Sequence, residues 1–223
     1  MYRVEIHVHT TASDGRDEPG IVVRAAARLG LKALAITDHN TFKGSIIASR
    51  ESNGDILIIY GNEVRSSRGD VLLLCPAPIQ AGVWRGMDPW RLREVADEWG
   101  CILVAAHPYH VGRSSVGGLM REPGLFDAVE VWNPRSVPVF NIPAMIHARR
   151  LGSPATSGSD AHVIEELGTA PILMEWAPSS VDDVLDAIRR GRVRPTYRLP
   201  GPRAYIAAAS WAIRRRLKRF LEQ

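Results

Sequence analysis

Short apolar runs alternate with helical patterns along most of this 223-residue chain. Apolar runs typical of buried strands occur at residues 4–6, 33–37, 55–60, 71–74, 102–106, 128–131, 154–157 and 171–175. Helical patterns lie between several of these runs, at residues 19–29, 88–99, 139–151 and 180–190. This alternation favours an α/β fold with a mostly parallel sheet, and the number of strands favours a barrel over an open sheet.

The composition excludes several classes of protein. With 45% hydrophobic residues the chain can form a full core, and no stretch approaches the roughly 20 apolar residues of a membrane span. The N-terminal residues lack the apolar segment of a signal peptide. Cys75 and Cys101 both lie in apolar runs, which predicts buried free thiols and a reducing cytoplasmic location.

The net charge of +4 is unevenly distributed. Residues 1–188 hold 17 basic and 23 acidic residues, whereas residues 189–223 hold 11 basic residues and the single acid Glu222. Residues 204–222 predict one amphipathic helix with an apolar stripe opposite a basic face. We therefore expect a barrel over residues 1–200 and a basic C-terminal helix over residues 201–223.

Three roles for this basic helix are open. Its apolar stripe could pack on the barrel and leave the basic face in solvent. The basic face could instead contact nucleic-acid phosphates, or the helix could lie on an anionic membrane. Trp211, on the polar side of the helix, could stack on a base or lie at a membrane surface.

Five of the seven histidines lie where a predicted strand ends. His7 and His9 are two residues apart, so on an extended segment both imidazoles point the same way and can reach one metal. Carboxylates accompany the histidines in most of these clusters. In a barrel the ends of successive strands converge, which predicts a multinuclear site for zinc, manganese or iron.

The strand-end motifs resemble those of the PHP (polymerase and histidinol phosphatase) family. In chain order they are His-Val-His-Thr from His7, Thr-Asp-His-Asn from Thr37, Gly-Asn-Glu from Gly61, Ala-His-Pro from Ala106 and Ser-Asp-Ala-His from Ser159. The resemblance covers roughly residues 2–175. It implies a distorted (β/α)7 TIM-like barrel that holds two or three divalent metal ions.

The resemblance also implies a ligand set. The first metal would be held by His7, His9, Glu63 and Asp160, with Glu63 bridging to a second metal that His107 also binds. A third metal would be held by Asp14, His39 and His162. Asp70 stands where many family members have a histidine ligand of the second metal. It is either a carboxylate ligand or a solvated turn residue beside a weak second site.

Other positions are expected to act on the substrate. Glu63 and Asp160 are the expected catalytic metal ligands, and His110 is a candidate proton donor. The resemblance implies a phosphate-binding residue soon after the Ala-His-Pro motif, and either His110 or Arg113 could take that role. Asn133 and Arg135 lie in a segment that resembles the family's Glu-x-x-Asn strand end and are candidate substrate contacts.

The expected function is hydrolysis of phosphate esters in nucleotides or at nucleic-acid 5′ ends by a metal-activated hydroxide. This would make the chain a nucleoside 3′,5′-bisphosphate phosphatase or a 5′–3′ exonuclease-like enzyme. A histidinol-phosphatase-like enzyme acting on a small metabolite is an alternative, although such enzymes tend to be longer. A non-catalytic metal-binding scaffold is an alternative of another class.

Overall fold

The fold is a nearly closed barrel of eight strands, seen in a computed structural model that describes residues 1–79 and 84–221. The sheet order is β7-β6-β5-β4-β3-β2-β1-β8. The strands are β1 (Tyr2–Glu5), β2 (Leu31–Ile36), β3 (Leu57–Ser66), β4 (Gly69–Cys75), β5 (Ile102–Ala105), β6 (Ala128–Trp132), β7 (Ala155–Ser157) and β8 (Ile172–Met174). Most neighbours are parallel, but β4 is antiparallel to both β3 and β5, and β8 is antiparallel to β1. The predicted α/β barrel is confirmed.

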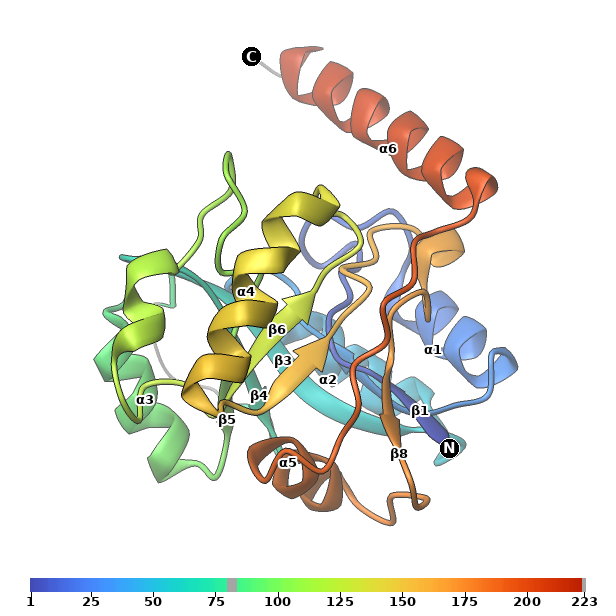
Figure 1. Ribbon diagram of the computed structural model, residues 1–223. Coiled ribbons are helices and arrows are strands. Elements are labelled where there is room, and N and C mark those ends of the chain that lie inside the picture. The colour runs from blue at the N-terminus through green and yellow to red at the C-terminus, as the bar shows by residue number, and fades with distance from the viewer. Residues whose placement is uncertain (80–83, 222–223) are drawn as a thin grey trace.

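Most of the helices lie around this sheet, and the C-terminal helix extends away from it (Figure 1). They are α1 (Pro19–Arg28), α2 (Lys43–Glu51), α3 (Pro89–Glu98), α4 (Pro138–Leu151), α5 (Val181–Arg189) and α6 (Pro202–Leu221), with two short 3-10 turns, η1 (Gly117–Arg121) and η2 (Ile164–Glu166). Helix α2 was not predicted. No described helix is long and apolar enough to cross a membrane.

Side chains, rather than a ladder of backbone hydrogen bonds, connect the two outer strands of the barrel. The Thr196 backbone N–H donates to Oγ of Ser157 at 3.0 Å, and the Thr196 hydroxyl donates to the Pro171 carbonyl at 2.6 Å. Ser157 lies in β7 and Pro171 directly precedes β8. The segment after α5 therefore closes the gap between the first and last strands of the sheet order.

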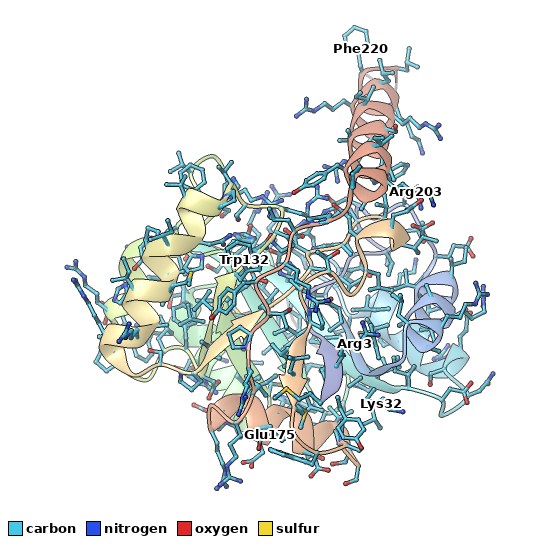
Figure 2. All side chains as sticks on the ribbon, turned by 45° about the vertical axis from the view of Figure 1, so that its right-hand side comes forward. Arg3, Lys32, Trp132, Glu175, Arg203 and Phe220 are labelled. Carbon is cyan, nitrogen blue, oxygen red and sulfur yellow. A yellow bond between two sulfur atoms is a disulfide. The ribbon has the colours of Figure 1, made fainter. Side chains whose placement is uncertain are left out.

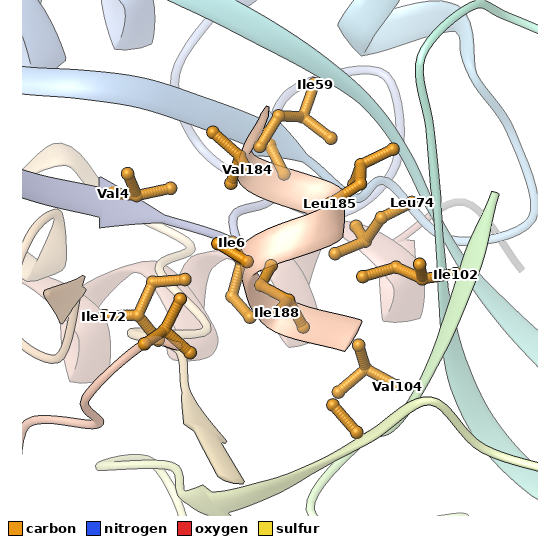
Figure 3. Packing of buried hydrophobic residues seen from close by; sticks show 14 of the residues in the cluster. Val4, Ile6, Ile59, Leu74, Ile102, Val104, Ile172, Val184, Leu185 and Ile188 are labelled. Carbon is orange, nitrogen blue, oxygen red and sulfur yellow. The ribbon is translucent and has the colours of Figure 1, made fainter. Parts of the chain in front are cut away.

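Helix α5 fills one end of the barrel. Its Val184, Leu185 and Ile188 are buried among strand residues that include Ile6 and Leu74 (Figure 3). A capping box at Ser180 and Asp183 fixes where this helix begins. Because apolar side chains fill this end, the polar strand ends at the opposite rim are left to form a site.

The prediction of two free thiols is wrong, because Cys75 and Cys101 form a disulfide. Leu74 of β4 pairs with Ile102 of β5, so the next residues outward, Cys75 and Cys101, face each other across the antiparallel pair with Cα atoms 4.2 Å apart. This register could not be inferred from two apolar runs separated by a helix.

Of the three roles left open for the basic helix, packing of α6 on the barrel through its apolar stripe is the one that the structure contradicts. Ile206, Ile213, Leu217 and Phe220 are 57–78% exposed, and Phe220 lies at the far tip of the helix (Figure 2). The helix instead contacts the barrel through buried Ala204 and through Trp211 and Arg215, which reach Asp14. Residues 222–223, the end of the predicted helix segment, lie outside the described residues.

Glu5 is a carboxyl group buried inside the barrel. Its Oε1 accepts hydrogen bonds from the Ser159 and Ile6 backbone N–H groups, and its Oε2 has no hydrogen-bond partner among the described residues. Burial raises the pKa of Glu5 from 4.5 to about 7. The unfolded chain therefore loses this proton at a lower pH than the folded protein does.

Glu5→Gln is expected to stabilise the metal-free protein above pH 7. The wild type should lose about 3 kcal/mol of its free energy of unfolding as pH rises from 4.5 to 7, because its unfolded state binds fewer protons in this range. The glutamine variant lacks this loss. Denaturant unfolding should therefore show that the free energy of unfolding of the variant exceeds that of the wild type by more at pH 8 than at pH 5. A difference between variant and wild type that does not change with pH would contradict this account.

Candidate metal centre

The polar rim of the barrel brings together all nine of the predicted metal ligands. They form four overlapping groups whose ligand atoms lie within 4.8 Å of one another: His9, Asp14, His39 and His162; His7, His9 and Glu63; His7, His107 and Asp160; and Glu63, Asp70 and His107. Seven of the nine residues are buried. Their roles as ligands remain predictions, but their convergence is a property of the fold.

Strand direction explains this convergence. His7 and His9 follow β1, His39 follows β2, His107 follows β5 and Asp160 follows β7, so each lies at a carboxyl end of a strand. Strand β4 runs in the opposite direction, which brings its beginning, with Asp70, to the same rim. Strand β3 is longer than predicted and continues through Glu63 along the rim.

Glu63 lies at the centre of the cluster. Its Oε2 is 3.4 Å from Nε2 of His7, 3.2 Å from Nε2 of His9 and 3.1 Å from Nδ1 of His39. Its Oε1 is 3.1 Å from Nε2 of His107. The two oxygens of one carboxylate therefore face different histidines, as a carboxylate that bridges two cations would.

Several of the candidate ligand atoms have no hydrogen-bond partner within the described part of the chain. Nε2 of His7, both ring nitrogens of His9, Nδ1 of His39 and Oδ1 of Asp14 are buried and accept or donate no hydrogen bond. Buried polar atoms normally have partners, because an unsatisfied one costs free energy. Imidazole nitrogens and carboxylate oxygens aimed at common points fit divalent cations, so the residues fit the metals that the sequence predicts.

The pKa values of the cluster show how closely its charges interact without metal. Burial by itself would raise the pKa of Glu63, but His7 and His39 outweigh it and hold that pKa well below its usual range. Burial lowers the pKa of His162 to about 4, helped by His9. In contrast, Asp160 and Glu63 overcome burial and raise the pKa of His9 to about 10. Cations that bind here must displace protons from such imidazoles.

Backbone geometry at two ligands is unusual. His107 has a φ of 29° and Asp160 a φ of 51°, in the left-handed region that residues other than glycine rarely adopt. Such strain persists where the surrounding structure holds it, and it is common at functional sites.

Asp70 is not a solvated turn residue, so that alternative is wrong. It is 2% exposed in β4, its Oδ1 accepts from Nε of Arg65 at 3.2 Å, and it lies in a group with Glu63 and His107. Burial and the nearby Glu63 raise the pKa of its carboxyl. Asp70 is therefore placed as a ligand would be.

The predicted substrate contacts are placed differently from one another. Arg113 and Arg135 line a cavity of about 170 Å³ together with the candidate ligands, and Arg113 forms an ion pair with Asp160. Asn133 is fully buried and donates to Glu130 and Asp160 at 3.0 and 3.2 Å. The structure therefore favours a positioning role for Asn133 over the predicted substrate contact.

His110 has less support as a proton donor. Its Nδ1 is 2.8 Å from the Ser136 hydroxyl, and it does not line the cavity. Burial, with Arg113 and His107, lowers the pKa of His110, which disfavours the protonated ring.

Glu130 is a positioning residue that links three parts of the site. Its Oε1 accepts from Nδ1 of His7 at 2.8 Å, and its Oε2 accepts from the His107 backbone N–H at 2.8 Å and from Asn133. Because Nδ1 of His7 is the donor in this bond, Nε2 is left to bind a metal. Only the Glu-x-x-Asn motif signalled this residue in the sequence.

Glu130→Gln is expected to weaken metal binding about tenfold. A glutamine amide cannot accept from His7, His107 and Asn133 together, so His7 loses its fixed orientation. Competition with a metal-binding dye should show the loss, whereas Glu94→Gln on the surface of α3 should bind metal as the wild type does. Equal affinities in both variants would exclude a positioning role for Glu130.

Three residues of the site were missed in the sequence. Glu166 accepts from the His162 backbone N–H at 2.8 Å and pairs with Arg135 at 2.7 Å, so it supports both residues. Arg215 of α6 forms an ion pair with Asp14. Arg215 and Arg65 both line the cavity. The spacing of Glu166 four residues after His162 was an available signal, but nothing in the sequence placed Arg215 beside Asp14.

Two family models match the chain. The PHP domain model matches residues 5–110, and the PHP-associated model matches residues 139–193. An uncharacterised protein of Methanocaldococcus jannaschii, MJ1587, is 27% identical over 143 residues, which are 59% of this chain and 81% of that protein.

Solved structures share the fold. A two-domain Bacteroides vulgatus protein containing a predicted PHP-like metal-dependent phosphoesterase has a TM-score of 0.72 at 17% identity, over 88% of this chain and 65% of its own. The lesion-specific endonuclease PfuEndoQ from Pyrococcus furiosus has a TM-score of 0.63 at 18% identity, over 87% of this chain and 57% of its own. The chain thus spans less than two thirds of either protein, and at these identities the likeness shows the fold alone.

Proposed function

Because this chain belongs to the PHP family, we propose that its ligand cluster catalyses metal-dependent hydrolysis of phosphate esters. The single observation that carries this proposal is the set of buried imidazole and carboxylate atoms in this cluster that have no hydrogen-bond partner within residues 1–79 and 84–221. The cations we propose are two or three zinc, manganese or iron ions. When bound, they would supply Lewis acidity and a water of lowered pKa.

The residues of the chain would divide the work between holding the cations and holding the substrate. His7, His9, Glu63 and Asp160 would hold one cation, while Glu63, His107 and Asp70 would hold the second. Asp14, His39 and His162 would hold a third. Arg113 and Arg135 project guanidinium groups into the same cavity, where they would bind and orient the phosphoryl oxygens.

Nucleotides or nucleic-acid 5′ ends are the substrates we propose. Arg65, Arg113, Arg135 and Arg215 all line the cavity of the metal centre, so it suits a strongly anionic ester. The Pyrococcus furiosus neighbour is an endonuclease, and a nucleic-acid contact through α6 or a 5′–3′ exonuclease-like activity is part of this proposal. The cytoplasmic location remains a prediction, and the Cys75–Cys101 disulfide removes the free thiols on which it partly rested.

Metal removal tests the proposal. Chelation should abolish hydrolysis of phosphate esters, and adding back Mn²⁺, Zn²⁺ or Fe²⁺ should restore it. The panel should contain small phosphomonoesters, histidinol phosphate, nucleoside 3′,5′-bisphosphates and 5′-phosphorylated oligonucleotides. Elemental analysis should confirm that the chelated protein is metal-free, and unchanged hydrolysis by that protein would refute the mechanism. A preference for histidinol phosphate would show that the substrate is a small metabolite and not a nucleotide or a nucleic-acid 5′ end.

A further inference from the structure

Helix α6 exposes a stripe of large apolar side chains along the side that faces away from the barrel. The stripe consists of Ile206, Ile213, Leu217, Phe220 and Leu221, which are 57–81% exposed. Spacings of three, four and seven residues place these side chains along one side of a helix. The helix extends away from the sheet, so the described part of the barrel leaves the stripe uncovered (Figures 1 and 2). These five residues are called the outer stripe.

The opposite side of α6 holds the helix on the barrel. Nε1 of Trp211 donates to the Asp14 carbonyl at 3.0 Å, and Arg215 forms an ion pair with the Asp14 carboxylate. Each residue turns the chain by about 100° around the helix axis, so Trp211 and Arg215 lie opposite Ile213 and Leu217. The outer stripe can therefore contact another surface while the helix keeps its contacts to Asp14.

Exposed arginines border the outer stripe on both sides. Residues 202–221 contain six basic residues and no acid. By the same helical spacing, Arg203 and Arg214 lie along one edge of the stripe, and Arg216 and the half-exposed Tyr205 lie along the other. The three arginines form no hydrogen bond or ion pair with residues 1–79 or 84–221. An apolar stripe between rows of cations is typical of a helix that lies in the plane of an anionic membrane.

Charge argues against a second copy of the chain as the partner of the outer stripe. Two α6 helices packed through their stripes would bring their arginines together, and like charges at an interface cost free energy. A cavity of about 540 Å³ beside α4, lined by the apolar side chains of Ile142, Met145 and Ile146, is the other candidate surface. Arg149 also lines it, and no acid among the described residues does. Neither surface supplies the negative charge that complements α6.

Nucleic acid fits only part of this surface. Its phosphates would pair with the exposed arginines, but the five side chains of the outer stripe would remain in water. Removing such side chains from water is favourable, and lipid provides this burial together with anionic head groups. The combination of stripe and arginines therefore favours lipid over nucleic acid as the partner of this side of α6.

We propose that α6 is an anchor for an anionic membrane surface, with the outer stripe inserted among the lipids and Arg203, Arg214 and Arg216 at the head groups. The helix is about 10 Å wide and is fixed to Asp14 on its other side, so docking holds the metal centre close to the membrane. This anchor goes beyond the proposed function and does not depend on whether the metal centre hydrolyses phosphate esters.

Co-sedimentation of the full chain with lipid vesicles tests the anchor. The probes are vesicles of equal parts phosphatidylcholine and phosphatidylserine, and vesicles of phosphatidylcholine alone. The wild type should bind the anionic vesicles at least tenfold more strongly, because each basic side chain near an anionic surface strengthens binding about fivefold. Ile213→Ser with Leu217→Ser should weaken this binding at least tenfold, because two apolar side chains no longer insert. Arg214→Ala with Arg216→Ala should remove most of the preference for anionic lipid.

Two matched double variants are the controls. Ile142→Ser with Ile146→Ser removes two half-exposed apolar side chains from α4, and Arg28→Ala with Arg50→Ala removes two exposed arginines from α1 and α2. Both should bind vesicles as the wild type does. Circular dichroism should show equal helix content in all the variants, and elemental analysis should show equal metal content.

Each of the other outcomes would overturn the anchor. Wild-type protein that binds neither vesicle, or both equally, excludes it, as does equal weakening by the α6 variants and their controls. A dimer in sedimentation velocity that Ile213→Ser with Leu217→Ser dissociates, without vesicle binding, would assign the outer stripe to a second copy. Vesicle binding that only the arginine variant weakens, and that an oligonucleotide displaces, would assign this side of α6 to nucleic acid. Hydrolysis enters none of these measurements, so the anchor and the proposed function can fail separately.

Discussion

Glu63→Gln is expected to lower turnover of a phosphate ester about a thousandfold and to release at least one metal ion. The carboxylate is 3.1–3.4 Å from nitrogens of four histidines, so it is the group best placed to bridge two cations. A neutral amide keeps the volume but removes the negative charge. Losing several kilocalories per mole of charge stabilisation in the transition state corresponds to this fall in rate.

Metal content and rate should fall together in this variant. Elemental analysis should show fewer than the wild-type number of ions, and steady-state assays should show the lower turnover. Glu165→Gln is the control and should behave as the wild type. Glu165 is a half-exposed glutamate near the same rim, and it pairs with Arg16. Full metal content with unchanged turnover in Glu63→Gln would show that Glu63 is not a ligand.

The sequence was sufficient to predict the barrel and, through the family resemblance, the nine residues that converge at its rim, whose roles as ligands remain predictions. Parallel strands in a barrel end at one rim, so polar residues after several apolar runs had to converge there. Asp70 was predicted from the resemblance alone, because placing it at this rim from the strand pattern would have required knowing that β4 runs in the opposite direction. Helix α2 was missed because Gly44 and Ser45 weaken its helical pattern; both are buried, so packing rather than helix propensity holds that segment.

Contacts between distant segments were beyond the reach of the sequence pattern. The facing positions of Cys75 and Cys101 depend on the register of β4 and β5. The orientation of α6 depends on where its Trp211 and Arg215 find partners, and a hydrophobicity pattern favours the opposite face. The roles of Glu130 and Glu166 depend on hydrogen bonds to backbone groups, which leave no periodic signal.

Gly158 controls the position of His7 through close packing. A Cβ added at this residue would lie 2.5 Å from Cβ of His7 and 2.7 Å from Oε1 of Glu130. Neither atom is the free end of a flexible side chain, since His7 is fixed on the rim and Glu130 is held by three hydrogen bonds. One added methyl group must therefore displace either His7 or the carboxylate that orients it.

Gly158→Ala is accordingly expected to reduce turnover about a hundredfold, because a displacement near 1 Å at a positioned group has an effect of this size. Overpacking should also lower the free energy of unfolding by about 1–3 kcal/mol. Gly118→Ala is the control, because a Cβ there would meet no atom within 4 Å. Denaturant unfolding would show whether Gly158→Ala still folds, and a metal-competition assay on the folded variant should show weaker binding. Wild-type metal affinity and turnover in Gly158→Ala would mean that the rim moves freely, and that His7 is not held in the position on which the proposed metal centre depends.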